Sequence, residues 1–270
     1  MRELLERHGL QLTKSLGQNF LHDENQIKKI VAQGELAAED KVLEIGPGLG
    51  PLTEHLIKEA GQVLSIELDG RLIPILQSRF ATAQNFELRH GDGLALMKEH
   101  ADWSQWKIIA NLPYSVGSAI LVEAALCAGC FQRIVATLQW EVVCRIGAAA
   151  GTPEYGLMSL LMQLRYKIEN RFKIRGTAFF PSPDVDSGVV TMVRRKEELL
   201  PIELHPLFIR LVKQGFSQRR KMMMKLLKEC WSSDELSEAF RQVGIPETIR
   251  AEAVTLEQFT LLTKILAKHS

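Results

Sequence analysis

The chain has 270 residues and a formal net charge of +1, and 46% of its residues are hydrophobic and 24% charged. This composition is ordinary for a soluble globular protein and supplies the core of one large or two modest domains. Charges interrupt the apolar residues at positions 1–7, and the sequence contains no run of about 18 uncharged apolar residues, so we expect neither a secretory signal nor a membrane partner.

Cysteine usage favours a reduced compartment. The four cysteines, Cys127, Cys130, Cys144 and Cys230, are too few and too scattered for a disulfide scaffold. Cys127 and Cys130 form a C-x-x-C pair, but no second pair of ligands accompanies it. Buried thiols in a cytoplasmic protein are therefore favoured over a metal or redox site.

Short apolar runs alternate with helical periodicity from about residue 24 to residue 140. Strands are expected at 42–46, 63–67, 86–89, 107–110 and 134–139. Helices are expected at 25–33, 51–60, 69–79 and 116–126. This alternation predicts an α/β fold with a mainly parallel, doubly wound sheet.

The pattern changes after Tyr155. Strands are expected at 164–174 and 189–194, on either side of a proline-rich loop at 179–186, and they add an antiparallel edge to the sheet. Beyond Lys196 only helices are expected, at 203–215, 217–229, 234–242 and 255–268. The sequence thus predicts a first domain at residues 1–197 and a small all-helical domain at 198–270.

A glycine loop follows the first strand of the predicted sheet. Gly46, Gly48 and Gly50 precede Pro51, a residue type that suits the first position of a helix. Glycines let the backbone approach a ligand closely, and the helix N-terminus offers free N–H groups. Dinucleotide-binding proteins use G-x-G-x-x-G, whereas the G-x-G-x-G spacing found here is common in S-adenosylmethionine enzymes.

Acidic residues follow the next two strands. Glu67 ends the second strand, 21 residues after Gly46, where a carboxylate accepts hydrogen bonds from ribose hydroxyls. Asp92 follows the third strand and is a candidate acceptor for an adenine amine. Either acid alone is equally compatible with a helix N-cap or a solvated turn. Together with the glycine loop, at consecutive strand ends of one open sheet, they predict a bound methyl donor.

Residues 111–114, Asn-Leu-Pro-Tyr, predict the acceptor of the methyl group. An adenine amine is a poor nucleophile because its lone pair is delocalised into the ring. The Asn111 side-chain oxygen and the backbone carbonyl beside it can each accept one of its N–H groups, which favours a pyramidal, reactive nitrogen. Pro113 fixes the backbone, and Tyr114 offers a flat face for a base. The alternative is a simple turn at the end of a strand.

Basic residues concentrate near the C-terminal end. The stretch 35–69 has eight acids and two lysines, whereas 204–228 has seven lysines and arginines and no acid. This asymmetry indicates a polyanionic partner. With Ser217 as N-cap, Arg219, Arg220 and Lys221 are expected in the first turn of a helix, where cations oppose the helix dipole unless a phosphate binds there. A merely solvated basic face is the alternative.

These motifs resemble the ribosomal RNA adenine dimethylases nearly end to end. The matching segments are 14–21 (Lys-Ser-Leu-Gly-Gln-Asn-Phe-Leu), 44–50, 66–69 and 111–114, then 138–145, 155–156, 178–187, 216–221 and 250–252. The Gly-Gln-Asn-Phe-Leu and Asn-Leu-Pro-Tyr motifs are specific to this family. Gln-Arg-Arg-Lys at 218–221 and Arg-Ala-Glu at 250–252 favour the branch that acts on the small ribosomal subunit.

The resemblance implies a Rossmann-like class I methyltransferase fold with S-adenosylmethionine as cofactor. The residues that it places at the cofactor are Asn19, Leu21, Gly46, Gly48, Glu67, Asp92 and Asn111. The residues that it places at the target base are Asn111, Leu112 and Tyr114, with Phe179 on the other face of the base. Without the family, Phe179 is more simply a core residue. In the helical domain, Arg219, Arg220 and Lys221 are expected to bind RNA.

The implied reaction is N6-dimethylation of adjacent adenosines in the 3'-terminal hairpin loop of small-subunit (16S) rRNA. The implied partner is that rRNA in a pre-mature ribosomal subunit, during ribosome biogenesis. The enzyme is expected to act as a monomer, without a metal. Two alternatives stay open: a large-subunit rRNA dimethylase of the antibiotic-resistance type, and a largely non-catalytic ribosome assembly factor.

Two residues depart from the family pattern. Trp140 and Asp184 stand where the family usually has lysine. Both are expected on the RNA side, where Trp140 would stack on a base or sugar. Asp184 would repel phosphate or pair with a nearby arginine such as Arg175.

Overall fold

The computed structural model describes residues 19–99 and 101–269, so positions 14–18 of the first family motif lie outside the described residues. By its contacts the chain forms two compact units. The first reaches to Val143 and includes Lys167–Arg194, and the second consists of Cys144–Tyr166 and the residues from Arg195 on. The sequence predicts a single boundary, between residues 197 and 198, and so assigns residues 144–166 to the domain that contains the sheet. In the structure these residues belong to the second unit.

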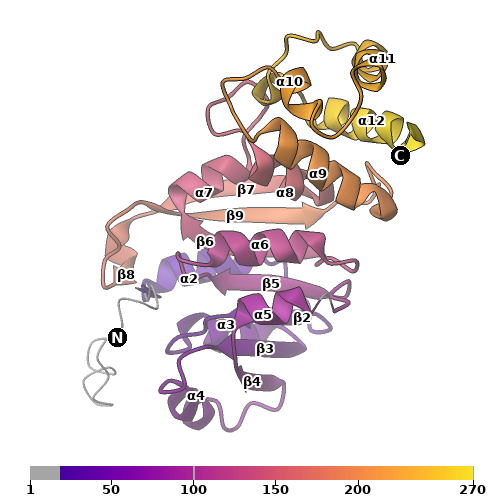
Figure 1. Ribbon diagram of the computed structural model, residues 1–270. Helices are drawn as coiled ribbons and strands as arrows, with labels where there is room; N and C mark the ends of the chain where they lie inside the picture. Colours follow the sequence, from indigo (N-terminus) through magenta and orange to yellow (C-terminus); the bar gives the residue numbers. More distant parts are fainter. Residues whose placement is uncertain (1–18, 100, 270) are drawn as a thin grey trace. The chain divides into compact units, whose positions relative to one another are not determined.

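A seven-stranded sheet is the centre of the first unit (Figure 1). Its strands follow the order β4 (Phe86–His90), β3 (Gln62–Glu67), β2 (Lys41–Ile45), β5 (Trp106–Asn111), β6 (Arg133–Gln139), β9 (Ser187–Arg194) and β7 (Tyr166–Ile174). Strands β4 to β6 in this order pair in parallel, and β9 pairs with β6 antiparallel. The predicted doubly wound sheet with an antiparallel edge is therefore confirmed.

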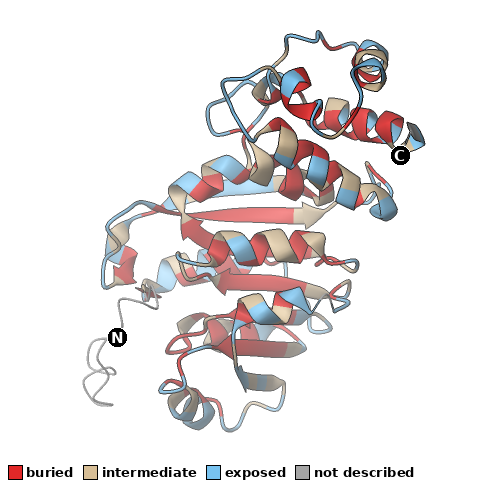
Figure 2. Cartoon of the chain, viewed as in Figure 1, coloured by how far each residue is buried: buried red, intermediate tan, exposed pale blue. Residues whose placement is uncertain are grey.

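Helices cover both faces of this sheet, which is why its inner strands are continuous apolar runs. On one face, α2 (Glu24–Ala32) and α3 (Pro51–Glu59) contact each other and pack on valines and isoleucines of the strands. On the other, α5 (Gly93–Lys98) contacts α6 (Gly117–Leu126). Helix α4 (Ile73–Arg79) contacts the outer strand β4. Figure 2 shows the inner strands buried along most of their length.

The second unit is built from helices α8 (Leu157–Arg165), α9 (His205–Gly215), α10 (Met223–Leu227), α11 (Ser233–Val243) and α12 (Leu256–Leu266). Helix α12 contacts α8, α9 and α11, and its Phe259 ring packs against Phe208 and Phe216. These contacts confirm the predicted helical C-terminal region. They also explain why α8 belongs to this unit.

Helix α8 corrects the predicted strand at 164–174. The strand β7 begins at Tyr166, and the residues before it are helical. Leu157, Leu160, Leu161 and Leu164 have the i, i+3, i+4, i+7 spacing of one helical face, and three of them are buried. Because the strand β7 follows α8 without a loop, hydrophobic periodicity alone does not show where the helix ends and the strand begins. The short helices α5 and α7 (Trp140–Ile146) were also not predicted.

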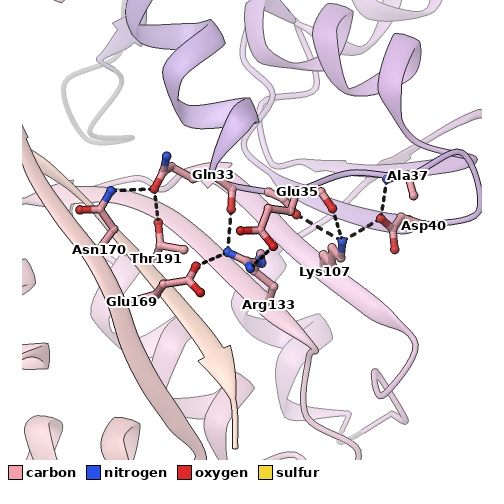
Figure 3. A network of polar contacts seen from close by, with 10 residues as sticks. Gln33, Glu35, Ala37, Asp40, Lys107, Arg133, Glu169, Asn170 and Thr191 are labelled. Carbon is pink, nitrogen blue, oxygen red and sulfur yellow. Dashed lines mark hydrogen bonds and ion pairs between the residues drawn. The ribbon is translucent and has the colours of Figure 1, made fainter.

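A network of polar contacts lies at the amino-terminal ends of the strands β5 and β6 (Figure 3). Arg133, the first residue of β6, pairs with Glu35 and Glu169. Lys107, near the start of β5, pairs with Asp40 at 2.7 Å and donates to two backbone carbonyls. Both cations are buried, and burial of a charge requires such partners. The network therefore ties residues 33–40 to the sheet, at the edge opposite to the predicted site.

Among the described residues, no helix combines the length and the apolar character needed to cross a membrane.

Candidate functional site

A cleft lies at the carboxyl ends of β2, β3, β4 and β5. The predicted site residues that line it are Asn19, Gly46, Gly48, Glu67, Asp92, Asn111, Leu112 and Tyr114. They come together because β2 is flanked by β3 on one side and β5 on the other, so the connections leave β2 and β5 in opposite directions. Ligands of open α/β sheets bind at such a switch point.

The glycine loop has a backbone that requires glycine. Gly46, Gly48 and Gly50 have φ angles of +73°, +62° and +83°, in the left-handed region. A Cβ atom on Gly48 would also lie 2.7 Å from ring carbons of Phe20. Helix α3 then begins with Pro51, as expected. The loop therefore brings backbone N–H groups and a helix N-terminus to the cleft.

Glu67 is held by the backbone of this loop. One carboxylate oxygen accepts from the Gly48 N–H at 3.0 Å and the other from the Asp69 N–H at 2.8 Å. The side chain is buried, and this burial raises the pKa of Glu67 above its ordinary value, against the lowering effect of these hydrogen bonds. A carboxylate has about four acceptor positions, so these backbone contacts leave acceptor capacity for a ribose hydroxyl.

We expect Glu67→Ala to weaken S-adenosylmethionine binding by about 1–3 kcal/mol, because polar groups at a buried site lose their partner. Isothermal titration calorimetry measures this change. Glu99→Ala, at an exposed glutamate after α5, is the control and should bind the cofactor as the wild type does. Unchanged affinity in a folded Glu67→Ala protein would remove Glu67 from the cofactor site.

Asp92 is both a helix N-cap and a residue of the cleft. It is the N-cap of α5, and its Oδ1 accepts from the Leu94 N–H at 2.8 Å. It also lines the cleft. The cap uses one carboxylate oxygen, which leaves the other for a ligand.

Asn111 lines the cleft and has a buried acceptor without a partner among the described residues. Its Nδ2 donates to the Asn19 carbonyl at 2.9 Å, and this contact fixes which way the amide is turned. Its Oδ1 is buried and has no hydrogen-bond partner among the described residues. The next residue, Leu112, donates its N–H to the Thr137 carbonyl at 3.1 Å. The position of the Asn111 oxygen is therefore fixed, and no donor among the described residues reaches it.

Tyr114 lies in the loop between β5 and α6 and is half-buried. Its hydroxyl hydrogen-bonds to the hydroxyl of Ser187. Burial raises the pKa of Tyr114 above its ordinary value, although the Ser187 hydrogen bond lowers it. The phenol is consequently neutral at physiological pH, and the ring lines the cleft beside Asn111.

Leu21 and Phe179 do not line the cleft, unlike the other residues expected there. They face each other in the two-stranded ladder of β1 (Phe20–Leu21) and β8 (Phe179–Phe180), and both are buried in the core with α2 and α3. In so short a strand only one of two neighbouring side chains faces the ligand. At β1 that residue is Phe20, which lines the cleft. Phe179 is therefore a core residue in this structure.

Sequence reasoning missed Phe20, Leu68 and Ser187. Leu68 is 55% exposed and lines the cleft next to Glu67, an unusual exposure for a large apolar side chain. Its position directly after the predicted acid was a usable signal. No local signal links Ser187 to Tyr114, because they are 73 positions apart.

The basic segment of the second unit is a loop, and Ser217 is not an N-cap. Its hydroxyl donates back to the Gln214 carbonyl at 2.7 Å, at the end of α9, and α10 begins only at Met223. Arg219, Arg220 and Lys221 are all exposed, and Arg219 also donates to the Pro153 carbonyl at 2.7 Å. The helix starts where buried apolar residues start, so the three cations precede it and do not form its first turn.

Asp184 is exposed and makes no ion pair with Arg175 or with any other described residue. The neighbouring Asp186 pairs instead with Lys173, at 2.9 Å.

Cys127 and Cys130 are buried and form no disulfide. Within the described ranges, no group of three or more His, Cys, Asp or Glu side chains is placed to hold a metal ion.

The cleft fits a nucleoside cofactor with an adjoining acceptor base. The glycine loop, Glu67 and Asp92 supply donors and acceptors for a ribose and an adenine, and Leu68 supplies an apolar wall. Asn111, the last residue of β5, and Tyr114, in the loop after it, also line the cleft. S-adenosylmethionine, when bound, supplies a methyl group on a positively charged sulfur.

Known proteins match this chain over nearly its whole length. The family model of the ribosomal RNA adenine dimethylases matches residues 9–268. The ribosomal RNA small subunit methyltransferase A of Latilactobacillus sakei is 38% identical over an alignment of 276 residues, which covers 98% of this chain and 93% of that protein. The protein of the same name from Geobacter metallireducens is 34% identical and covers 96% of both chains.

Solved structures agree with these relatives. The 23S rRNA methyltransferase ErmE has a TM-score of 0.71 at 26% identity and covers 92% of this chain and 100% of its own. A dimethyladenosine transferase from Plasmodium falciparum has a TM-score of 0.76 at 22% identity, over 92% of this chain and 98% of its own, which shows the shared fold. The chain therefore belongs to the ribosomal RNA adenine dimethylase family, whose members use S-adenosylmethionine.

Proposed function

We propose that this protein dimethylates the N6 atoms of two adjacent adenosines in the 3'-terminal hairpin loop of small-subunit (16S) rRNA. The substrate is a pre-mature ribosomal subunit in the cytoplasm, and the enzyme acts as a monomer without a metal. The curated relatives with 34–38% identity, which carry a small-subunit name, support the choice of subunit.

The buried Oδ1 of Asn111 is the observation that carries the proposal. A buried acceptor without a partner costs about 1–3 kcal/mol, and Asn111 Oδ1 has none among the described residues. An N–H of the target amine satisfies it, and the Leu112 carbonyl accepts the second N–H. The two acceptors hold the nitrogen with its lone pair toward the methyl donor. No strong base is required, because the methylated nitrogen is cationic and loses its proton readily, so positioning carries the catalysis.

Tyr114 supplies the stacking face for the flipped base. Extraction of a base costs a few kcal/mol, and one aromatic stack offsets about 1–3 kcal/mol of it. Because Phe179 is buried in the core, we assign it the support of the ladder between β1 and β8 and not a second stack.

A methyl-transfer assay with isolated ribosomal subunits from cells lacking the enzyme tests this function. We expect two N6,N6-dimethyladenosines in small-subunit rRNA, mapped by mass spectrometry of RNA fragments. The similarity to the 23S rRNA methyltransferase ErmE favours one alternative, and a product confined to large-subunit rRNA would support it. Cofactor binding without any product would indicate a non-catalytic assembly factor.

The helical domain at 198–270, extended by residues 144–166 that pack with it, is proposed to bind RNA phosphates through the exposed Arg220 and Lys221. Arg219, which we had also assigned to RNA, instead has a partner in the Pro153 carbonyl. Its guanidinium thus orders the basic loop and has fewer donors left for phosphate.

We expect the Arg220→Gln, Lys221→Gln double variant to reduce the slope of log affinity against log salt by about one per lost contact. Filter binding or fluorescence anisotropy over a salt series measures it. The matched control neutralises Lys264 and Lys268, two exposed lysines of the same unit, and should keep the wild-type slope. Equal slopes for the two double variants would indicate a solvated basic face.

A further inference from the structure

Tyr114 is anchored at both ends although it lies in a loop. Its backbone follows β5, and its hydroxyl contacts Ser187, the first residue of β9. Ser187 is fully buried and lies opposite Gln139, the last residue of β6. A phenol held at its far edge keeps its plane, while the faces of the ring stay available for a base. Without this contact, rotation about the side-chain bonds would move the ring out of the stacking position.

Trp140 contacts the residues at the start of β9 on both sides of Ser187. The backbone N–H of Trp140 donates to the Asp186 carbonyl at 2.8 Å. Its ring lies over Gly188, where a Cβ atom would come within 2.4 Å of the ring atom Cε3. The backbone of residue 140 thus contacts the residue before Ser187, and the tryptophan ring packs on the residue after it.

Lys173 closes this arrangement from the edge strand β7. Its ammonium lies 5.2 Å from the centre of the Trp140 ring and 2.9 Å from Asp186 Oδ2. Since Gly188 and Lys173 both lie against the indole, Trp140 is a poor candidate for the stacking on RNA that its position suggested. A lysine at position 140 offers no flat surface to pack on Gly188. The Trp140 ring therefore packs inside the fold, between Gly188 and Lys173.

We infer that Ser187 and Trp140 are positioning residues for the methyl transfer: the Trp140 ring packs on the start of β9 at Gly188, and Ser187 holds the Tyr114 ring in the plane that receives the target base. This inference rests on the proposed function, because it concerns the stacking role of Tyr114. Neither residue touches the reacting atoms.

A double-mutant cycle tests the link between Ser187 and Tyr114. Ser187→Ala and Tyr114→Phe should each lower kcat about fivefold to tenfold, the effect of one hydrogen bond. The double variant should be no slower than either single variant, because both changes remove the same contact. Cofactor affinity should stay at the wild-type value. Tyr155→Phe, which removes another buried tyrosine hydrogen bond, is the control and should leave kcat unchanged.

Trp140 is tested by two substitutions. Trp140→Phe keeps a flat ring over Gly188 and should retain most of the activity, whereas Trp140→Lys should lower kcat to the level of Ser187→Ala. The loss in Trp140→Lys should not add to that of Ser187→Ala. Additive losses, or a Trp140→Lys enzyme as fast as the wild type, would overturn the role of Trp140.

A spectroscopic readout separates this inference from the proposed function. The chain has three tyrosines, so protein labelled with 3-fluorotyrosine gives three 19F signals, and Tyr114→Phe identifies that of Tyr114. In the free protein, Ser187→Ala and Trp140→Lys should shift and broaden this signal and leave the other two unchanged. A Tyr114 signal that ignores both substitutions would overturn the inference. A response in a protein that methylates no RNA would instead support the positioning and refute the proposed activity.

Discussion

Asn111→Ala is expected to lower kcat for methyl transfer by about 100-fold or more, the loss typical of removing one preorganised hydrogen-bonding group from an active site. Asn111 Oδ1 is buried and without a partner among the described residues, so its desolvation is already complete before the base arrives. An acceptor of this kind strengthens its interaction as charge develops on the target nitrogen, without reorganising water.

Single-turnover methylation with saturating cofactor measures this loss, and calorimetry measures cofactor affinity in parallel. The affinity should fall by no more than about 1 kcal/mol, the contribution of one hydrogen bond. Asn170→Ala, at an exposed asparagine of β7, is the matched control and should turn over at the wild-type rate. If Asn111→Ala lost cofactor affinity and kept its rate, Asn111 would serve the cofactor and not the target amine.

Glu44→Gln is expected to make the protein more stable than the wild type at pH 8, by about 3 kcal/mol. Glu44 lies in β2 before the glycine loop and is 1% exposed, with hydrogen bonds from the hydroxyls of Thr53 and Ser65. Burial, which outweighs these two hydrogen bonds, raises the pKa of Glu44 from 4.5 to about 7. A difference of this size between the Glu44 pKa in the folded and in the unfolded state changes the free energy of unfolding by about 3 kcal/mol, at about 1.36 kcal/mol per pKa unit.

The sign follows from proton uptake. Between pH 4.5 and about 7, Glu44 is protonated in the folded state and ionised in the unfolded state. Glu44 therefore contributes its full stabilisation at low pH. This contribution is lost as the pH rises through about 7. Glutamine carries no such proton and remains uncharged. The advantage of Glu44→Gln should therefore be small at pH 5 and reach its full size near pH 8.

Urea unfolding between pH 5 and pH 8 measures this difference. Glu59→Gln, at an exposed glutamate of α3, is the control and should keep the pH dependence of the wild type. A constant difference between Glu44→Gln and wild type over this range would show that Glu44 is already ionised in the folded protein at pH 5.

The site motifs were readable from the sequence because each lies at the end of a strand. Gly46, Glu67, Asp92 and Asn111 each close or follow a short apolar run. In a parallel sheet these ends share one edge, so the local pattern already brings them together. Composition and periodicity likewise predicted the sheet and the helical C-terminal region, since burial on both faces leaves continuous apolar strands.

Tertiary structure decided what lies between these motifs. Whether Phe20 or Leu21 faces the cleft depends on the pairing of β1 with β8, because neighbouring side chains of a strand point to opposite faces. The start of α10 at Met223 depends on which apolar residues the helical unit buries, and this left Arg219, Arg220 and Lys221 in a loop. The contact of Ser187 with Tyr114 joins residues that are distant in the chain. The sequence by itself thus determined the chemistry of the site, because its functional residues lie in short motifs at strand ends. Strand pairing and burial depend on residues that are distant in the chain. They decided which side chains face the cleft and which ones support those side chains.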